Sequence, residues 1–371
     1  MTGPSRSLTS HVKTFRTAKG LTQSQLADQV GVKRQAIYDI ESGKYAPNTA
    51  VALRLAKVFD CRVEDLFSEE GDEERDYTLI GRPEGNNPRV SLAMLRGRLL
   101  AYPLAGTEPF SSGFEAADGL LTPDQNRVRL LSPSDRIDQS IVLLGCDPAF
   151  ALLGQHASRL AASTRVHCRF ASSVKAIRRL AQGHAHIAGT HLHSGDRDDA
   201  NILLAKQSLG RQQAIIVGFS RIEEGLLVAK GNPLAIRRLE DLTNPAVRLI
   251  NREPGAALRA LLDELLLRQG VPAAAIAGYE DTVTNHAEGA QSVLHGKASA
   301  ALGFRAVADL HGLDFVPLES ARCELVVPKD ILDHPAMRIL LDSLQTRQLR
   351  SDITALAGYE AESTGSIITE L

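Results

Sequence analysis

The chain has 371 residues, of which 43% are hydrophobic and 23% charged, with a net charge of −2. This length predicts two or three globular domains whose cores need no disulfide or metal to hold them, and the near balance of charge excludes a wholly basic nucleic-acid coat protein. The absence of tryptophan and an aromatic content of 4% argue against a surface that stacks sugars or bases.

Nothing in the sequence directs the chain to a membrane or to an oxidising compartment. The N-terminus has no apolar run of signal-peptide length, and no segment approaches the roughly 18 apolar residues of a membrane span. The four cysteines, Cys61, Cys146, Cys168 and Cys323, are scattered without a Cys-x-x-Cys pair, a pattern typical of reduced thiols. We therefore expect a cytoplasmic protein without a membrane partner.

The first 67 residues are locally basic and predict a bundle of short helices. They carry ten Lys or Arg and six Asp or Glu, a net charge of +4. Helices are expected at 8–19, 21–30, 33–42, 48–59 and 63–67. Thr22 is a good N-cap for the second helix, and Gln25 three residues later completes a capping box. Gly31 and Val32 supply the tight turn before the third helix.

The spacing of this segment resembles the Xre, or lambda-repressor-like, helix-turn-helix family. The resemblance is carried by Leu-Thr-Gln at 21–23, Leu-Ala at 26–27, Gly-Val at 31–32 and Ile-Glu-Ser-Gly-Lys at 40–44. It implies that the third helix enters the major groove of double-stranded operator DNA, where arginine can pair with guanine and glutamine with adenine. The residues that it assigns to DNA binding are Thr22, Gln23, Lys33, Arg34, Gln35, Tyr38 and Lys44.

Four of these assignments have a particular environment. Gln23 begins the second helix and would hold a phosphate there, with Lys44 also near the backbone. Lys33 stands where the family often has a capping Ser or Thr, and Tyr38 could instead pack against the helices.

Two segments separate this head from the rest of the chain. Residues 68–76 hold six acidic residues and one arginine, which predicts a self-repelling linker. Residues 77–135 show short apolar runs broken by Gly, Pro and Asn, which predict a small β-rich connecting region.

From residue 136 to 371, apolar strands alternate with helical runs, which predicts a parallel α/β sheet. Strand and helix pairs are expected at 140–144 with 148–160, 165–170 with 174–182, 246–250 with 256–269 and 299–303 with 305–310. Several strings in order, among them Leu-Gly-Cys-Asp-Pro at 144–148 and Gly-Thr-His-Leu at 189–192, are similar to type II periplasmic-binding-protein domains related to molybdate-binding proteins. This resemblance implies two lobes, the second at about 229–322, with crossing strands near 221–229 and 323–328.

In that fold a ligand lies between the lobes, where strand ends face helix N-termini that favour anions. The resemblance therefore implies a small polar or anionic effector, either an oxyanion or a carboxylate. The residues that it places in this cleft are Cys146, Asp147, Ser172, Ser173, Thr190, His191, Gly255, Ala256, Arg259, Asn285 and His286. Helix capping is the alternative role of Asp147, Ser172 and Ser173, and an ordinary surface helix start is that of Asn285 and His286.

The chain departs from the family at 255–259, where Gly-Ala-Ala-Leu-Arg replaces the family's Gly-Ala-Gly-Thr-Arg. The lost glycine and hydroxyl count against molybdate itself, but Arg259 can still pair with an oxyanion or carboxylate, and we expect it to face Ser173 across the cleft. The histidine pairs 184/186 and 191/193 with Asp196 could suggest zinc. The resemblance implies that a strand's length separates the two pairs, so we expect no metal and no cofactor.

Catalytic motifs are missing from the sequence. It has no P-loop, no Gly-x-Ser-x-Gly and no His-Glu-x-x-His, and the Cys of Gly-Cys-Asp-Pro has no histidine assigned beside it. We therefore expect a multidomain protein that is not an enzyme: an all-α helix-turn-helix domain followed by an α/β two-lobed sensor domain. The predicted function is that of a one-component transcriptional regulator, acting as a homodimer or higher homo-oligomer. The alternative is a small-molecule enzyme or metal-handling protein with an autoregulatory DNA-binding head.

Overall fold

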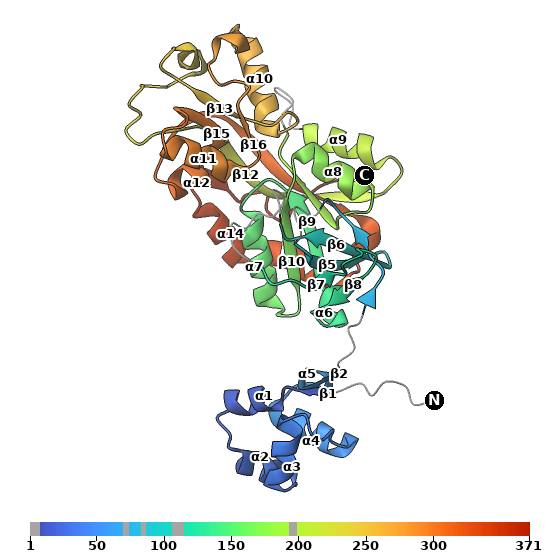
Figure 1. The fold of residues 1–371 in the computed structure, drawn as a ribbon. Helices are drawn as coiled ribbons and strands as arrows, with labels where there is room; N and C mark the ends of the chain where they lie inside the picture. The colour runs from blue at the N-terminus through green and yellow to red at the C-terminus, as the bar shows by residue number, and fades with distance from the viewer. Residues whose placement is uncertain (1–7, 70–73, 83–86, 106–114, 193–198) are drawn as a thin grey trace. The chain divides into compact units, whose positions relative to one another are not determined.

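The computed structural model describes residues 8–69, 74–82, 87–105, 115–192 and 199–371. The chain divides into two compact units, Met1–Glu74 and Arg75–Leu371, and each is described here by itself (Figure 1). In the described ranges no helix is both long and apolar enough to cross a membrane. Residues 70–73 of the predicted linker lie outside the described part of the chain. His193 and Asp196, from the zinc alternative, also lie outside it.

The first unit is a bundle of short helices with one pair of strands. Its elements are β1 (Leu8–Ser10), α1 (Val12–Ala18), α2 (Gln23–Val30), α3 (Arg34–Glu41), α4 (Thr49–Phe59), α5 (Val63–Leu66) and β2 (Phe67–Glu69). The sequence predicts a helix from residue 8, but β1 instead pairs antiparallel with β2, which satisfies main-chain groups ahead of α1. The other four predicted helices are confirmed to within two residues.

The turn between α2 and α3 rests on a capping box and a buried apolar interface. The Thr22 hydroxyl accepts from the Gln25 N–H at 3.2 Å, and the Gln25 side chain accepts from the Thr22 N–H at 2.8 Å. Gly31 ends α2 in the left-handed region, at φ +71°, where glycine is favoured. The buried side chains that join the helices are Leu26, Ala27, Val30, Ile37, Ile40 and Leu55.

The second unit begins with a small six-stranded sheet. Its strands are β3 (Glu74–Arg75), β4 (Thr78–Leu79), β5 (Arg89–Leu95), β6 (Arg98–Pro103), β7 (Gly119–Leu121) and β8 (Val128–Leu130), in the order β3-β8-β7-β5-β6-β4. Because side chains alternate along a strand, one face of β5 and β6 packs with α6 (Ser134–Asp138). The other face, with Leu95 and Tyr102, joins the core of the larger sheet that follows.

The larger sheet has ten strands and is shared by two lobes. The strands are β9 (Ser140–Gly145), β10 (Arg165–Phe170), β11 (Ile187–Thr190), β12 (Ala214–Val228), β13 (Leu249–Arg252), β14 (Thr282–Val283), β15 (Ala300–Phe304), β16 (Asp314–Pro328), β17 (Tyr359–Glu360) and β18 (Ile367–Glu370). The main order is β10-β9-β11-β16-β12-β15-β13-β14. The predicted alternation of strands and helices and the two-lobed α/β class are confirmed.

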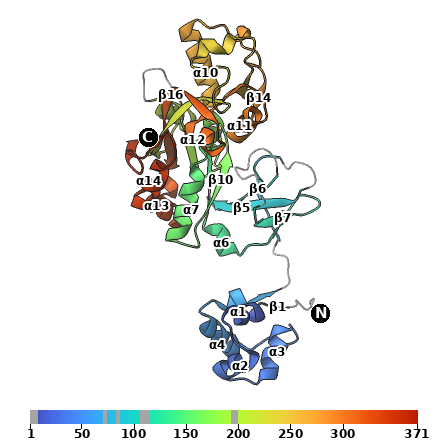
Figure 2. The same ribbon diagram turned by 90° about the vertical axis from the view of Figure 1, so that its left-hand side faces the viewer.

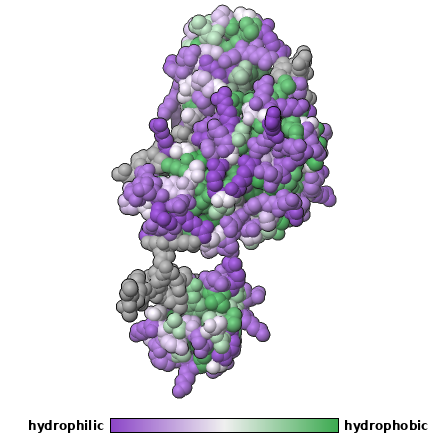
Figure 3. All heavy atoms as spheres, turned by 90° about the vertical axis from the view of Figure 1, so that its right-hand side faces the viewer, coloured by the Kyte–Doolittle hydropathy of each residue, from purple (hydrophilic) through white to green (hydrophobic). Residues whose placement is uncertain are grey.

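Helices cover both lobes (Figures 1 and 2). In the first lobe these are α7 (Phe150–Leu160), α8 (Ser173–Ala181), α9 (Ala200–Leu209), α13 (Pro335–Leu344) and α14 (Arg347–Thr354); in the second they are α10 (Ala257–Gln269), α11 (His286–Leu294) and α12 (Arg305–Leu310). Short 3-10 turns lie at η1 (Leu239–Thr243), η2 (Ala273–Ala275) and η3 (Lys329–Ile331). The face seen in Figure 3 is mostly hydrophilic over both units.

The two long strands β12 and β16 cross between the lobes. They pair antiparallel, Ala214 with Pro328 at one end and Val228 with Asp314 at the other. Toward its end β12 also pairs with β15 of the second lobe, whereas the end of β16 pairs with β11 of the first. A Cβ at Gly225, beside an irregularity of the pairing, would lie 2.1 Å from the Val316 carbonyl oxygen, so only glycine allows this close approach.

Candidate functional site

The start of α3 presents the residues that the sequence assigns to DNA bases. Lys33 is the N-cap of α3 without a side-chain cap, and Lys33, Arg34 and Gln35 are exposed. The Gln35 amide donates to Asp39 one turn later, at 3.0 Å. Because Ile37 and Ile40 bury the opposite face of α3, the polar side chains of its first turn point away from the core.

Two further predicted residues lie beside this face. Tyr38 is 46% exposed, so it does not fill the core. The Lys44 ammonium lies 5.6 Å from the centre of the Tyr38 ring, which is a cation–π distance.

Gln23 takes part in a contact that the sequence does not reveal. Its amide donates to Glu41 at 2.8 Å, and the Arg16 guanidinium binds the same carboxylate through two nitrogens, at 2.5 and 3.2 Å. The Arg16 and Glu41 side chains are 12% and 4% exposed. This buried ion pair joins α1 to α3 and holds Gln23 at the start of α2.

In the second unit, parallel strands bring their carboxyl ends together between the lobes. In the first lobe β9, β10 and β11 run parallel, so the loops after them, with Cys146, Ser173 and His191, meet at one edge. In the second lobe β13, β14 and β15 run parallel and end at Arg252, at the loop before His286, and at Phe304.

Cys146, His191 and Glu224 form a buried chain of contacts. The Cys146 Sγ lies 2.7 Å from His191 Nε2, and His191 Nδ1 lies 2.8 Å from Glu224 Oε1. Burial by itself lowers the pKa of His191, but Cys146 and Glu224 outweigh it and raise this pKa well above its ordinary value. Glu224 belongs to the crossing strand β12, and no sequence motif singles it out.

The second lobe contributes Arg252, His286 and Phe304 to the same region. The His286 ring stacks on Phe304 with centroids 4.2 Å apart, and the Arg252 guanidinium lies 3.2 Å from the His286 ring. Burial, Arg252 and His191 hold the pKa of His286 well below its ordinary value, against a backbone hydrogen bond to Cys146 of the other lobe. His286 is therefore neutral at neutral pH.

Contacts across the cleft close the two lobes onto each other. The Arg252 guanidinium lies 5.5 Å from the centre of the Phe170 ring, at the end of β10. His191 and Phe304 meet edge to face, with centroids 5.4 Å apart. Side chains from both lobes are more than nine-tenths buried here, so the two lobes pack directly against each other.

Asp147 lies beside this group and is fully buried. One of its oxygens accepts from the Ala149 N–H at 2.8 Å and from the Tyr359 hydroxyl at 2.7 Å. Burial raises the pKa of Asp147. The aspartate thus supports the start of the loop into α7 and links it to strand β17.

The remaining first-lobe residues have structural contacts. Ser172 is the N-cap residue of α8 but makes no capping hydrogen bond through its side chain. The Ser173 hydroxyl accepts from the His191 N–H at 3.2 Å, which fixes the loop that carries His191. Thr190 is buried, with its hydroxyl 3.5 Å from the Glu324 carbonyl oxygen.

The second-lobe predictions need a correction at Arg259. Its guanidinium stacks on Tyr279 at 4.0 Å and bonds to Asp263 at 3.2 Å, both in its own lobe, so its contacts do not reach Ser173. Position 259 lies inside the first turn of α10, whereas Arg252 ends strand β13 and contacts Phe170 of the other lobe.

The other second-lobe residues are helix-start positions. Asn285 caps α11 by accepting from the Glu288 N–H at 2.9 Å, the role that the sequence left open. Gly255 takes φ +90° ahead of Ala256, which is the N-cap of α10.

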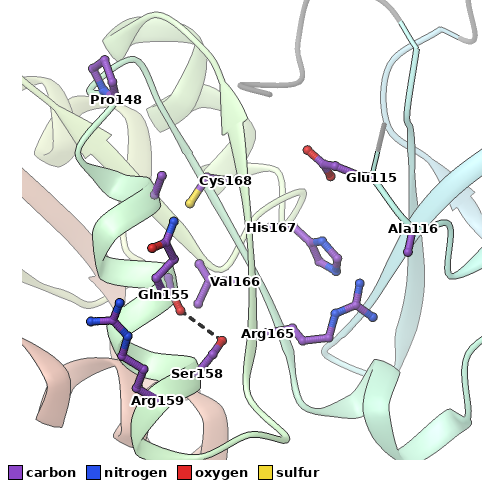
Figure 4. Close-up of a pocket in the computed structure, with 12 residues that line it drawn as sticks. Glu115, Ala116, Pro148, Gln155, Ser158, Arg159, Arg165, Val166, His167 and Cys168 are labelled. Atoms are coloured by element: carbon purple, nitrogen blue, oxygen red, sulfur yellow. Dashed lines mark hydrogen bonds between the residues drawn. The ribbon is translucent and has the colours of Figure 1, made fainter. Parts of the chain in front are cut away.

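A surface pocket lies elsewhere, on the outer edge of the first lobe. It has a volume of about 710 Å³ and lies between α7, the edge strand β10 and residues Glu115 and Ala116 (Figure 4). Arg165, which it exposes, pairs with the buried Asp118. None of the predicted ligand residues lines this pocket.

Comparisons with known proteins agree with both units. Residues 12–66 match the helix-turn-helix family, and residues 154–345, just over half of the chain, match the PBP superfamily domain. The Bacillus subtilis protein YvgK is 29% identical over 231 residues, 62% of this chain and 74% of YvgK. An uncharacterized HTH-type transcriptional regulator of Archaeoglobus fulgidus is 46% identical over 56 residues, 15% of this chain and 80% of that protein. The sulfate-binding protein SubI from Mycobacterium tuberculosis has 17% identity and a TM-score of 0.44, over 59% of this chain and 86% of SubI.

Proposed function

The chain belongs to the PBP superfamily and carries a helix-turn-helix domain, and from this premise we propose that it is a one-component transcriptional regulator controlled by a small ligand. The observation that carries the proposal is the start of α3. There Arg34 and Gln35 are exposed on a helix whose other face is locked into a buried core. Such a helix can enter the major groove and present both side chains to base edges.

The proposed ligand is a small polar or anionic molecule held between the lobes. Support comes from two donors at the carboxyl ends of the strands, the Arg252 guanidinium at the end of β13 and the Ser173 hydroxyl at the start of α8. Charged donors in a site shielded from water bind carboxylates or oxyanions well. Separation of the lobes about β12 and β16 would admit the ligand, and closure would hold it.

The proposed regulator binds DNA as a homodimer. A single head of this kind reads only a few base pairs, so two copies on a pseudo-palindrome, with half-sites about 34 Å apart, supply the specificity. Lobe closure would then act by changing the spacing of the two α3 helices.

Operator selection from genomic fragments, followed by a gel-shift titration of the selected site, tests the proposal. Arg34→Ala is expected to weaken the selected site by roughly 1–3 kcal/mol and to relax specificity at one base pair. Arg62→Ala, at an exposed arginine beside α5, is the matched control for the loss of one charge. Operator preference unchanged by Arg34→Ala would contradict the assignment of α3.

A further inference from the structure

The contacts of His191 arrange a thiol, a base and a carboxylate in sequence. The Glu224 carboxylate can only accept, so at 2.8 Å it accepts a hydrogen bond from His191 Nδ1–H, which keeps its proton. Nε2 is then free to accept the thiol proton of Cys146, whose Sγ lies 2.7 Å away. A nucleophile, a base and a group that orients the base are the parts from which activated cysteines are built.

The surroundings hold this order in place. Cys146 follows β9 directly and His191 follows β11, while Glu224 comes from the crossing strand β12. Phe304 packs edge to face on the His191 ring, and Ser173 holds the His191 main chain. Burying a carboxylate destabilises the fold unless a charged or hydrogen-bonded partner offsets the loss of hydration. Packing alone therefore does not explain a glutamate at position 224, which is fully buried.

We propose that Cys146 is a nucleophile that bonds covalently to a small molecule with an electrophilic carbon, with His191 as its base and Glu224 as a positioning residue. The Cys146 proton passes to His191 Nε2, and a sulfur electron pair forms the new S–C bond. The bond from that carbon to its leaving group breaks, and the leaving group departs with the electrons. The reaction rests on the proposed function in one respect: the lobes must separate to admit the molecule.

The other cysteines lack this arrangement. Burial raises the pKa of Cys168 to about 12, and its thiol donates to the Phe150 carbonyl oxygen at 3.3 Å. Burial and then Asp147 raise the pKa of Cys323 well above its ordinary value. Cys61, half-buried in the first unit, therefore serves as the reference thiol within the same chain.

The test is alkylation of the full-length protein with iodoacetamide, followed by peptide mass spectrometry. Iodide is the leaving group in this case. Cys146 is expected to be labelled faster than Cys61, and His191→Asn to slow labelling of Cys146 by about tenfold or more while labelling of Cys61 stays unchanged. Circular dichroism of each variant shows that it is folded.

Glu224 is tested by the pH profile of the same reaction. Glu224→Gln removes the charge that stabilises the protonated His191 ring, so the profile for Cys146 is expected to move to higher pH, and Glu224→Asp to recover part of the shift. A carboxylate with a purely structural role would leave the profile where it is, and that result would overturn the positioning role.

Access to the cleft has its own control. Ser173→Cys, made together with Cys146→Ser, places a thiol at a position that contacts the His191 main chain, and not its ring, in the same buried region. If this thiol is labelled and Cys146 in the natural protein is not, the lobes open and the nucleophile assignment is wrong. If neither thiol is labelled, both the proposed opening of the lobes and the nucleophilic role of Cys146 are contradicted. The DNA-binding role of the first unit is tested separately by the Arg34→Ala titration.

Discussion

His186 should make the second unit sensitive to mild acid. Its Nδ1 accepts from the Val142 N–H at 3.1 Å, and Nε2 lies 3.1 Å from the Met94 carbonyl oxygen. Both ring nitrogens are thus satisfied in the neutral form, which ties β9 of the first lobe to β5 of the small sheet. Burial, opposed by the Met94 hydrogen bond and aided by His334 and Arg96, lowers the pKa of His186 from 6.5 to about 4.

The sign and size of the effect follow from this difference. Below pH 6.5 the unfolded chain binds a proton at His186, whereas the folded protein does not bind it until about pH 4. The free energy of unfolding therefore decreases as the pH is lowered from 6.5 to about 4. A tenfold change in a proton-binding constant is about 1.4 kcal/mol, which makes the full loss about 3 kcal/mol. Between pH 8 and pH 5 the loss from His186 alone is about 2 kcal/mol.

The assay compares urea denaturation of the full chain at pH 8 and pH 5, followed by circular dichroism because the chain has no tryptophan. His186→Gln should lower stability at pH 8, since it replaces a ring that is bonded on both sides, but should shrink the loss between the two pH values by about 2 kcal/mol. His295→Gln, at an exposed histidine, is the matched control. An equal loss in natural protein and His186→Gln would refute the reasoning.

Two further predictions concern the head and its control. Glu41→Gln removes the negative charge that pairs with Arg16, and the Arg16 and Glu41 side chains are only 12% and 4% exposed. We therefore expect the free energy of unfolding of the first unit to fall by about 3 kcal/mol, measured as faster amide hydrogen exchange in α1 to α3 of the full chain. Unchanged exchange would show that the pair does not stabilise the bundle. Operator DNA should change the affinity of the cleft ligand by the same factor by which ligand changes operator affinity, with about 1–3 kcal/mol of coupling. Calorimetry with and without saturating operator measures this factor, and equal affinities would mean that the cleft does not control the head.

Local patterns were enough to predict most of the elements. Thr22 and Gln25 form the capping box that their spacing indicates, because a capping box needs only residues three apart. Strands of the α/β region follow from their apolar runs in the same way. Residues 8–10 are one exception, because their strand exists only through a partner nearly 60 positions away, which no local pattern contains.

The site was harder to predict because it is assembled by topology. Cys146 and His191 were both assigned to the cleft, but their contact depends on β9 and β11 being parallel neighbours, and this is what places a histidine beside the Gly-Cys-Asp-Pro cysteine. The parallel alternation itself was the signal that could have joined them. Arg252 was missed for a related reason: the family pattern points to an arginine at a helix start, whereas the arginine that crosses the cleft ends a strand.

The position of Glu224 connects the thiol to the motion of the lobes. At this residue β12 begins to pair with the second lobe, Glu224 lying opposite Phe304 of β15, while its carboxylate binds His191 of the first lobe. Phe304 in turn packs on the same histidine. A rotation of one lobe against the other must therefore change the surroundings of His191 from two sides at once. A ligand that holds the lobes closed would shield Cys146 and fix its base in one geometry, so the rate of thiol labelling reports occupancy of the cleft as directly as a change in DNA binding does.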